Sequence, residues 1–495
     1  MRLSQANLAA LAGVAAIPRY DRSALRNGIV HIGVGNFHRA HQAVYLDDLF
    51  NLGHDLGWAL VGAGVRPADD AMRRDLATQD LLTTVVEQEA TRSSARVIGS
   101  MTHFLPPGDA AATIARLADP AIRIVSLTIT EGGYYVDPAT QRFDPEHADI
   151  VADAAAIEAP CTAFGLIVAG LMRRRGAGIA PFTVMSCDNL PGNGHATGNA
   201  VAGLAALVDP ALAGWIRRNV AFPNAMVDRI TPATTPRERA SLEASFGIVD
   251  ARPVFCEAFR QWVLEDTFTD GRPALEEVGV TFVADVEPWE LMKIRMLNGG
   301  HATMAYPAAL LDIHFVHEAM QDALVSAFLS RVIGDEIVPV VPPVPDTVLQ
   351  DYQKVIERRF ANPRIGDTIR RLCFDGSNRQ PKFILPSVAD RLRAGLAVEG
   401  LALVGALWCR YCHGETESGA VIEPNDPQWA RLQAAARASR DTPEAWLGMR
   451  DLVGDVGTEP RYRTAFSAAL ARLWRDGTRA ALAAYLAGDT RVVAR

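Results

Sequence analysis

Over residues 28–285 the sequence alternates between short runs rich in β-branched residues and stretches long enough to form helices. Strands that alternate with helices are typical of a mostly parallel sheet with helices on both faces. We expect strands of that sheet at residues 28–34, 58–65, 81–87, 122–130 and 182–187. Two further strand-like runs between residues 251 and 285, PVFCEAF and VTFVADV, are expected to extend the sheet in mixed orientation.

After about residue 287 the apolar residues recur at helical spacing, and a proline-rich loop at residues 338–346 interrupts this pattern. The fold class that we predict is α/β. A Rossmann-type doubly wound sheet domain over residues 1–285 is followed by a mostly α-helical domain over residues 286–495. The first 20 residues lack the basic start and the clear cleavage site of a signal peptide, and we interpret them as a short helix.

The charge and the cysteine distribution exclude several classes of partner. The chain of 495 residues has a formal net charge of −8, whereas binding to nucleic acid favours a basic surface. No uncharged apolar run reaches the ~18 residues of a membrane-spanning helix. Six cysteines are scattered without a signal sequence, which fits free thiols in a reducing cytoplasm. We therefore expect a cytoplasmic protein that acts on a small molecule rather than on nucleic acid or a membrane.

Lysine is almost absent from this sequence. Of the 49 basic residues only Lys293, Lys354 and Lys382 are lysines, and the other 46 are arginines. Arginine cannot lose its proton inside a protein, whereas lysine can. The three lysines are therefore the first residues to inspect for general-base chemistry, although chance retention explains any single one of them equally well.

A dinucleotide-binding turn is expected after the first strand. Gly33 and Gly35 follow that strand and precede a helix, so backbone N–H groups can approach a pyrophosphate. His38 occupies the position of the third glycine of the usual G-x-G-x-x-G pattern. The cluster His38-Arg39-Ala40-His41 is expected either to add to phosphate affinity or to form a solvated helix start.

The residue that contacts the adenosine ribose is expected after the second strand. Asp69 is the candidate, because an acid at this place hydrogen-bonds the ribose 2′-hydroxyl of NAD. Arg66 stands nearby and can accept the 2′-phosphate of NADP instead. The sequence therefore favours NAD and leaves NADP open. The alternative role for Asp69 is that of a helix N-cap.

Three residues with different chemistry share the helical segment that opens the second half. At about 100° per residue, Asn298 lies about 140° from Lys293, and His301 lies between them, so all three share one broad face. A neutral lysine can take a hydroxyl proton there, and the amide can donate to a developing alkoxide. Gly299 and Gly300 are unfavourable inside a helix and indicate a close approach to its backbone. The alternative is an ordinary helix with a solvated lysine and a core histidine.

Two polar islands stand at or near the ends of strands. Asn189 follows the expected strand at residues 182–187, and doubly wound folds bind ligands at the carboxyl ends of strands. Asp228 lies in the second island, FPNAMVDRITP. Both islands have turn formation as an alternative. Neither a Tyr-x-x-x-Lys pair nor a clear Cys/His/Glu zinc set is recognisable in the sequence.

Six motifs together resemble the polyol-specific long-chain dehydrogenases, also called the mannitol dehydrogenase family. They are GVGNFHRAHQ, SLTITEGGYY, SCDNLPGNG, FPNAMVDRITP, KIRMLNGGH and RLCFDGSNRQPKF, and they extend from residue 33 to beyond residue 380. The resemblance implies a nucleotide-binding domain, a mostly helical C-terminal domain and an active site between them. It also implies NAD as the cofactor, no metal ion, and a monomer or weak oligomer.

The resemblance further implies roles for individual residues. Lys293 is the implied general base, and Glu290 belongs to its proton path to solvent. Asn189 and Asn298 are implied to hold the reacting oxygen, and His301 to orient the substrate. The predicted cofactor contacts are Gly33, Gly35, Phe37, His38, Arg39, Asp69 and Thr130. The predicted substrate contacts are Asp228, Arg371, Arg379, which stands where a lysine is expected, and Lys382.

The implied reaction is the oxidation of D-mannitol to D-fructose and its reverse. Reductases of the hexuronates D-fructuronate and tagaturonate share the lysine-based machinery, as do arabinitol and sorbitol dehydrogenases, and they remain alternatives. For a hexuronate, Arg371, Arg379 and Lys382 can hold the carboxylate. A non-catalytic NAD-binding module that senses redox state is a further alternative, although such a module has no need of a general base.

Overall fold

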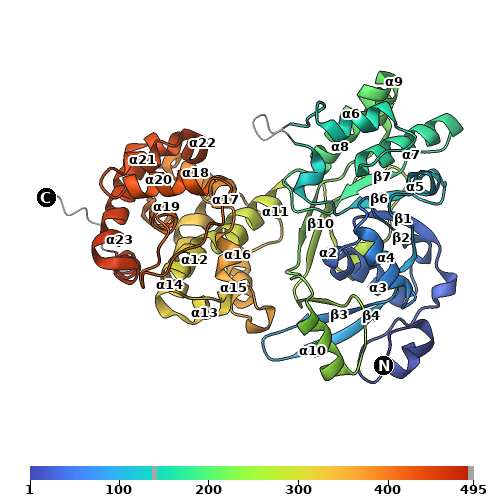
Figure 1. Cartoon of the computed structure of the whole chain (residues 1–495), viewed down its shortest axis with the longest axis horizontal. Coiled ribbons are helices and arrows are strands. Elements are labelled where there is room, and N and C mark those ends of the chain that lie inside the picture. Colours follow the sequence, from blue (N-terminus) through green and yellow to red (C-terminus); the bar gives the residue numbers. More distant parts are fainter. Residues whose placement is uncertain (137–141, 489–495) are drawn as a thin grey trace. The chain divides into compact units, whose positions relative to one another are not determined.

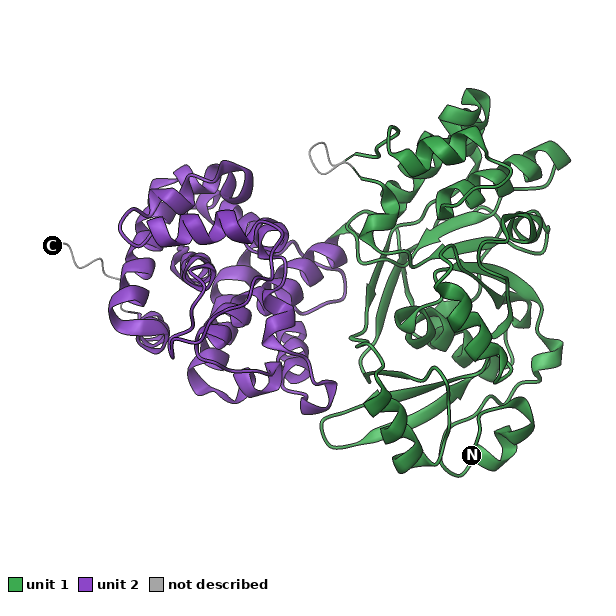
Figure 2. Cartoon of the chain, viewed as in Figure 1, with its two compact units in different colours: residues 1–287 green, residues 288–495 purple. Residues whose placement is uncertain are grey.

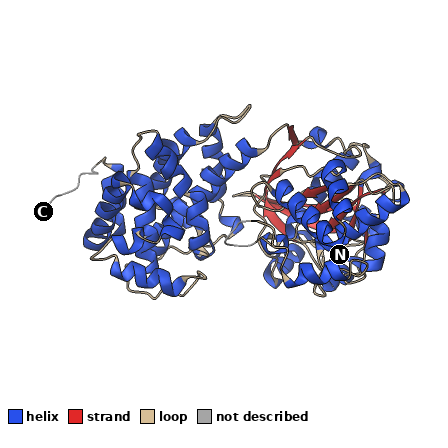
Figure 3. Cartoon of the chain, turned by 90° about the horizontal axis from the view of Figure 1, so that it is seen from above, coloured by secondary structure: helices blue, strands red, loops and turns tan. Residues whose placement is uncertain are grey.

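The computed structural model describes residues 1–136 and 142–488. The chain divides into two compact units, Met1–Glu287 and Pro288–Arg495 (Figures 1 and 2). Among the described residues all named strands belong to unit 1, and unit 2 is built from helices (Figure 3). Within residues 1–136 and 142–488, no helix is long and apolar enough to cross a membrane.

Unit 1 contains a five-stranded parallel sheet with the strand order β5-β2-β1-β6-β7. Its strands are β1 (Asn27–Ile32), β2 (Ala59–Ala63), β5 (Met101–Phe104), β6 (Ile124–Leu127) and β7 (Thr183–Ser186). The chain runs from β1 to β2 on one side and later to β6 on the other side, so the topological switch point lies between β1 and β6. Doubly wound folds bind ligands at such a point. This sheet confirms the predicted Rossmann-type architecture.

The strand expected at residues 81–87 lies outside the parallel sheet. It forms β3 (Thr83–Gln88), which pairs antiparallel with β4 (Ser93–Ile98) and parallel with β9 (Val254–Glu257). Residues 89–92 alone connect β3 to β4. Because a parallel crossover needs a dozen or more residues, this short connection makes a hairpin instead.

The strand-like runs after residue 251 do not extend the parallel sheet either. The first becomes β9, and the second becomes β11 (Thr281–Val283) in a separate sheet with β10 (Gln261–Glu265) and β8 (Ala225–Asp228). There β10 pairs antiparallel with β8 and parallel with β11. Trp262 and Leu264 of β10 belong to the core on one face of the parallel sheet. The third sheet therefore covers a face and does not lengthen an edge.

Two hydrophobic cores lie on the two faces of the parallel sheet. On one face α5 (Ala110–Leu117), α7 (Ala163–Ala177) and α8 (Asn193–Val208) pack on Val30 and Val125. On the other face α3 (Gln42–Asn51) packs on Ile29 and Ile124, which alternate with those valines along the strands. The other helices of unit 1 are α1 (Leu8–Leu11), α2 (Asn36–Ala40), α4 (Asp69–Ala77), α6 (Ala148–Ala155), α9 (Pro210–Asn219) and α10 (Pro236–Phe246).

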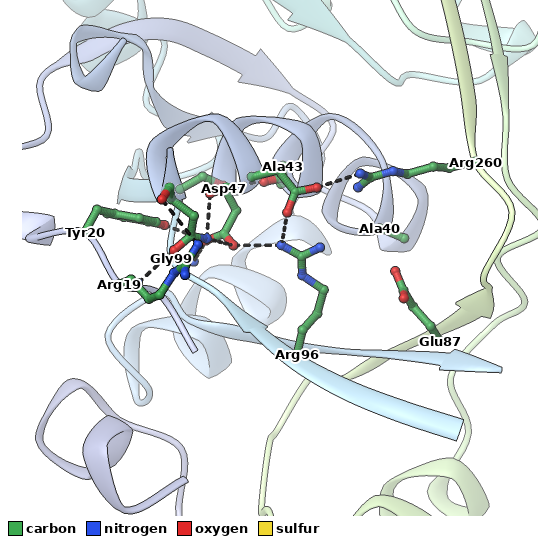
Figure 4. Close-up of polar contacts among 12 residues, drawn as sticks. Arg19, Tyr20, Ala40, Ala43, Asp47, Glu87, Arg96, Gly99 and Arg260 are labelled. Carbon is green, nitrogen blue, oxygen red and sulfur yellow. Dashed lines mark hydrogen bonds and ion pairs between the residues drawn. The ribbon is translucent and has the colours of Figure 1, made fainter. Parts of the chain in front are cut away.

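A buried ionic network joins α3 to the hairpin of β3 and β4 (Figure 4). Asp47 of α3 accepts hydrogen bonds from Tyr20 Oη (2.6 Å), the Gly99 amide (3.0 Å) and Arg96 of β4 (3.0 Å). Burial raises the pKa of Asp47, and Arg96 opposes that shift. Arg96 also pairs with Asp48. The network therefore fixes the sheet of β4, β3 and β9 to α3, which directly follows α2.

Unit 2 is built around two buried helices, α12 (Gly299–Leu310) and α19 (Glu399–Cys412), which pack against each other. Two of its segments are π-helices, η6 (Lys293–Asn298) and η7 (Val332–Ile337). The other α-helices are α11 (Glu287–Met292), α13 (Val316–Gln321), α14 (Ala323–Arg331), α15 (Leu349–Phe360), α16 (Ile369–Cys373), α17 (Gly376–Phe383), α18 (Leu385–Arg393), α20 (Trp429–Ala438), α21 (Glu444–Leu447), α22 (Arg450–Val453) and α23 (Pro460–Leu486). The mostly helical character of this half is thereby confirmed.

Candidate active site

The turn after β1 begins with a glycine that other residues cannot replace without strain. Gly33 lies at the switch point and has φ +99°, in the left-handed region that side chains disfavour. A Cβ built on Gly33 would lie 2.1 Å from the carbonyl oxygen of Thr128, which follows β6. The turn therefore runs in direct contact with the end of the neighbouring strand.

Gly35 leaves room for a ligand in front of α2. It is the N-cap of this helix, and the nearest atom that a Cβ on Gly35 would meet is the Gly33 carbonyl oxygen, 3.8 Å away. Backbone amides at the start of a helix bind phosphate groups. The residues of this turn consequently fit the pyrophosphate of a dinucleotide.

His38 does not present a cation to a phosphate. Its ring is 1 % exposed and stacks on His31 of β1, with the ring centroids 3.5 Å apart. His31 in turn contacts the hydroxyls of Ser126 (2.8 Å) and Thr128 (2.9 Å). Burial lowers the pKa of His31 to about 3 and also lowers that of His38. Both shifts favour neutral rings, so a positive charge on His38 is not expected to attract a phosphate. A contact of His38 with the cofactor stays a prediction.

The rest of the His38–His41 cluster is buried as well, so the alternative of a solvated helix start is wrong. Arg39 is 1 % exposed and donates to the Gly35 carbonyl (3.2 Å) and to the Asn36 side chain (2.8 Å). Phe37 is half-buried, and its ring stacks on that of His41 with centroids 4.8 Å apart. These contacts hold α2 in place. Arg39 thus directs its donors to the protein beside the turn, whereas the sequence suggested a phosphate.

Asp69 organises the loop after β2. Its Oδ2 atom accepts hydrogen bonds from the amides of Val65 and Arg66, both at 3.0 Å. Gly64 makes room for this carboxylate, because a Cβ there would lie 2.6 Å from that of Asp69. The N-cap of α4 is Ala68, so the N-cap alternative for Asp69 is wrong. The contact of Asp69 with a ribose stays a prediction.

Asp188, which sequence reasoning did not single out, organises the ends of β6 and β7. Its carboxylate accepts hydrogen bonds from the amides of Ile129 (3.0 Å) and Thr130 (2.9 Å) and from Tyr134 Oη (2.8 Å). Thr130 is exposed and has φ +65°, which is uncommon for a residue other than glycine. Asp188 therefore holds Thr130 in a strained conformation, and the exposed Asn189 follows directly. The sequence signal that could have identified Asp188 was an acidic residue placed between a strand and Asn189.

A buried arginine follows Asp228, the last residue of β8. The Arg229 guanidinium donates to the carbonyls of Ala40 (2.5 Å) and Glu257 (3.0 Å) and to the carboxylate of Glu87 (2.6 Å). It joins the end of α2, β3 and β9 to the segment that carries Asp228. Its partners Ala40 and Glu87 lie 189 and 142 residues away in the sequence, so local pattern carried no signal for this role.

In unit 2 the segment that carries Lys293 and Asn298 is a π-helix. The Gly299 amide bonds to the Ile294 carbonyl, five residues earlier. Because i→i+5 bonds define this geometry, Asn298 stands about one turn after Lys293 and not about 140° around the axis. The angle predicted from α-helical spacing is therefore wrong, and the two side chains lie closer to one line. Lys293 is 7 % exposed, and Asn298 is half-buried.

Contacts with neighbouring helices hold the π-helix in place. Arg295 pairs with Asp390 of α18 at 2.6 Å and donates to the Val340 carbonyl, also at 2.6 Å. At its end, a Cβ on Gly299 would lie 3.2 Å from the Phe383 carbonyl oxygen. The group that approaches the backbone at Gly299 is thus the Phe383 carbonyl of the protein itself, as the glycine pair predicted a close approach.

Gly300 admits an aromatic ring that orients His301. A Cβ on Gly300 would lie 3.1 Å from Ile333 and 3.5 Å from the ring of Phe360. The Phe360 ring stacks on His301 with centroids 4.1 Å apart and an interplanar angle of 16°. The plane of the imidazole is therefore set by α15, an element that sequence reasoning had not connected with the site.

The predicted substrate contacts of unit 2 differ in their surroundings. Arg371 of α16 pairs with Asp367 through two hydrogen bonds, one of which, from Nε, is 2.5 Å long. Arg379 of α17 donates to the Arg371 and Leu372 carbonyls, both at 3.3 Å. Lys382 is exposed near the end of α17. Helices α16 and α17 both pack on α12, which carries His301.

The arrangement in unit 2 suits proton transfer at an alcohol. The π-helix and the first turn of α12 carry an amine, an amide and an imidazole at residues 293, 298 and 301, and the half-buried Glu290 stands three residues before Lys293 on α11. An amine can accept a hydroxyl proton, and an amide N–H can donate to the oxygen that remains. In the described part of the chain no group of three or more His, Cys, Asp or Glu side chains is placed to hold a metal ion.

Comparison with protein families matches nearly the whole chain. The family model described as the mannitol dehydrogenase Rossmann domain matches residues 27–277. The model described as the mannitol dehydrogenase C-terminal domain matches residues 285–474. The mannitol 2-dehydrogenase of Cereibacter sphaeroides is 61 % identical over 471 residues, which cover 95 % of this chain and 98 % of that protein.

Two solved structures are also similar over most of their length. One is the mannitol 2-dehydrogenase of Pseudomonas fluorescens in a ternary complex with NAD and D-mannitol, with 43 % identity and a TM-score of 0.87 over 98 % of this chain and 100 % of that one. The other is a substrate-free D-sorbitol dehydrogenase, with 34 % identity and a TM-score of 0.91 over 97 % of this chain and 100 % of that one.

Proposed function

The chain belongs to the mannitol dehydrogenase family, and from this premise we propose that it oxidises D-mannitol to D-fructose with NAD, using Lys293 as the general base and no metal ion. It is an NAD-dependent polyol dehydrogenase. The reaction removes one proton from the C2 hydroxyl and one hydride from C2. The proposal concerns which residues of this chain perform these two tasks.

The cofactor is held by the carboxyl edge of the parallel sheet in unit 1. The turn Gly33–Gly35 and the first amides of α2 contact the pyrophosphate, Asp69 contacts the adenosine ribose, and Thr130 completes the site at the end of β6. When bound, NAD accepts the hydride. His38 and Arg39 contribute by supporting α2, in keeping with their burial.

Lys293 takes the proton of the C2 hydroxyl. Burial disfavours a charged amine, which suits a lysine that is 7 % exposed to a role as a neutral base. Glu290, one turn earlier, passes the proton on to solvent. Asn298 donates to the oxygen as negative charge develops, and His301 orients the substrate. Arg371, Arg379 and Lys382 contact the polyol, and the roles implied for Asn189 and Asp228 of unit 1 stay predictions.

One observation carries the proposal. In the π-helix η6 the amide of Asn298, which can donate to an oxygen, stands about one turn after the buried Lys293. Lysine is scarce in this chain, where 46 of the 49 basic residues are arginines. A non-catalytic NAD-binding module has no use for such a pair. Turnover of a polyol or ketose by the purified protein distinguishes the enzyme from that module.

The general base is tested with Lys293→Ala. We expect kcat to fall by at least about a thousandfold, because the proton acceptor is removed, and small primary amines such as methylamine to restore part of the rate. Lys354→Ala is the matched control, since Lys354 is exposed on α15 and paired with Asp351. Near-wild-type activity of Lys293→Ala, with or without added amine, contradicts the assignment.

Substrate, cofactor and metal independence are tested together. Initial rates of reduction of D-fructose and D-fructuronate are measured with NADH and, separately, with NADPH, in the presence of EDTA. We expect NADH to reduce D-fructose fastest and EDTA to leave the rate unchanged. Loss of activity in EDTA contradicts metal independence, and preference for D-fructuronate contradicts the substrate.

D-sorbitol oxidation is a second candidate, because a D-sorbitol dehydrogenase has a similar structure over nearly the whole chain. Mannitol and sorbitol both give D-fructose when they are oxidised at C2, so the reductive assay does not separate them. Oxidation rates of the two polyols with NAD do. A higher kcat/KM for D-mannitol supports the first candidate, and a higher value for D-sorbitol supports the second.

A further inference from the structure

Just before α16, which packs on the helix that carries His301, an acidic residue pairs with the guanidinium that a charged substrate would need. Asp367 accepts two hydrogen bonds from Arg371, one from Nε at 2.5 Å and one from a terminal nitrogen. This two-point pairing is the strongest arrangement of a guanidinium with a carboxylate. The side chain of Asp367 is only 9 % exposed, whereas that of Arg371 is 54 % exposed. In this pair the carboxylate of Asp367 is therefore buried, and the guanidinium of Arg371 is exposed to solvent.

The backbone holds Asp367 independently of its partner. Its carbonyl accepts a hydrogen bond from the Val316 amide at 3.0 Å, and the next residue, Thr368, forms a β-bridge with Phe315. Thr368 is also the N-cap of α16 and accepts a hydrogen bond from the Arg371 amide. Both members of the pair are thus fixed by the same short element.

The pair lies next to the residues that are proposed to orient the substrate. Helix α16 packs against α12, whose first turn carries His301. Burial acts to raise the pKa of Asp367, but Arg371 and, to a smaller extent, His301 together hold that pKa below its usual value. Asp367 is consequently within electrostatic reach of both the imidazole and the guanidinium.

We propose that Asp367 is a specificity-determining residue that makes this site select neutral polyols and ketoses over sugar acids. By holding Arg371, it cancels the charge that would attract a substrate carboxylate, and it adds like-charge repulsion against one. Arg371 still has donors for neutral hydroxyl groups. This inference rests on the proposed function and adds the charge class of the substrate to it.

The test compares two ketoses that differ only at C6. D-fructose has a hydroxymethyl group there, and D-fructuronate has a carboxylate. The ratio of their kcat/KM values with NADH is measured for the wild type and for Asp367→Asn, which keeps the shape of the side chain and removes its charge. The ratio does not depend on the folded fraction of a preparation, because both substrates are assayed on the same enzyme.

We expect Asp367→Asn to raise the ratio for D-fructuronate over D-fructose by roughly tenfold at low ionic strength. The gain should shrink in about 0.5 M NaCl, since salt screens a half-exposed guanidinium. In the double variant Asp367→Asn/Arg371→Met the gain should disappear, because it requires the released Arg371. Asp451→Asn is the matched control: it removes the acid of the pair with Arg431, at 2.5 and 2.6 Å, in the same unit.

Each outcome decides the matter. An unchanged ratio in Asp367→Asn, or the same change in Asp451→Asn, overturns the role of Asp367 while D-fructose reduction by the wild type still supports the proposed function. A gain that persists in the double variant overturns the role of Arg371 as the released partner. If the wild type reduces D-fructuronate better than D-fructose, or neither ketose, the proposed function and this inference fail together.

Discussion

Acid should destabilise unit 1 through its buried histidines. Burial lowers the pKa of His31 and of His41 to about 3, and it lowers that of His38 in the same direction. A histidine of the unfolded chain has a pKa of about 6.5. Between these values the unfolded state binds more protons than the folded state. The free energy of unfolding is therefore unaffected well above pH 6.5 and falls as the pH drops below it.

The size of the effect follows from the lowered pKa values of His31 and His41. At pH 5 the solution is about 1.5 pH units below the unfolded pKa, and each unit is worth about 1.4 kcal/mol. His31 and His41 thus each remove about 2 kcal/mol of stability relative to pH 8, or about 4 kcal/mol together, and His38 adds to this loss. Since domains are stable by only about 5–15 kcal/mol, unit 1 should approach unfolding near pH 5.

Hydrogen exchange read by mass spectrometry follows each unit separately, because peptides from β1 and β6 report on unit 1 and peptides from α19 on unit 2. His38→Phe removes one titrating ring. Its ring nitrogens have no hydrogen-bond partner in the described part of the chain, so phenylalanine can keep the stack on His31. We expect this variant to match the wild type at pH 8 and to be more stable at pH 5.

The control is His54→Phe, which replaces a histidine that is about half exposed in the same unit. Two results would refute the reasoning. The first is an unfolding free energy of unit 1 that stays constant from pH 8 to pH 5. The second is a His38→Phe variant whose loss of stability on acidification equals that of the wild type.

Two other predictions concern positions in unit 1. Gly33→Ala should lower the free energy of unfolding by several kcal/mol and reduce the yield of soluble protein, because its Cβ would lie 2.1 Å from the Thr128 carbonyl oxygen. Gly35→Ala should keep the melting temperature and raise KM for NAD about tenfold or more. Equal effects of the two variants on folding would contradict the open space before α2. Arg229→Met should raise KM for both NAD and D-mannitol in the folded enzyme, whereas Arg174→Met, which removes a buried arginine bound to four backbone carbonyls, should lower stability and leave KM unchanged.

The parallel sheet was predictable because its strands are short apolar runs separated by helices, a pattern contained in the sequence itself. The strand at residues 83–88 was assigned to the wrong sheet for a physical reason. Its partner β9 begins 166 residues after the end of β3, at residue 254, and local pattern does not specify pairing over that distance. The hairpin connection at residues 89–92 was the one local signal that could have corrected the assignment.

The histidine cluster shows the limit of reading polar residues as exposed ones. His38 and His41 look like a basic helix start in the sequence, but their environment is decided by His31 on a neighbouring strand and by the Gln261 carbonyl on β10. Burial changes their chemistry from cationic to neutral. The charge state of such residues is a tertiary property, and residue type alone predicted it wrongly.

The residues proposed for the site in unit 2 stand out in the sequence, whereas their geometry does not. Lys293, Asn298 and His301 stood out by type, since lysine is scarce and the three could share one face. Their actual arrangement depends on departures from an ideal α-helix. The π-helix moves Asn298 to about one turn after Lys293, and the missing side chain of Gly300 lets Phe360 reach the ring of His301.

These departures explain why a π-helix followed by two glycines is useful here. A regular α-helix would spread an amine and an amide five residues apart over about 140°, too far around the axis to meet one hydroxyl group. A π-helix is rare and less favourable than an α-helix, and it is found frequently at functional sites. Here the ion pair of Arg295 with Asp390 and the packing of Ile333 and Phe360 on Gly300 hold it from outside. If Lys293 and Asn298 act on the same oxygen, as proposed, these supporting contacts are what bring the two side chains into line.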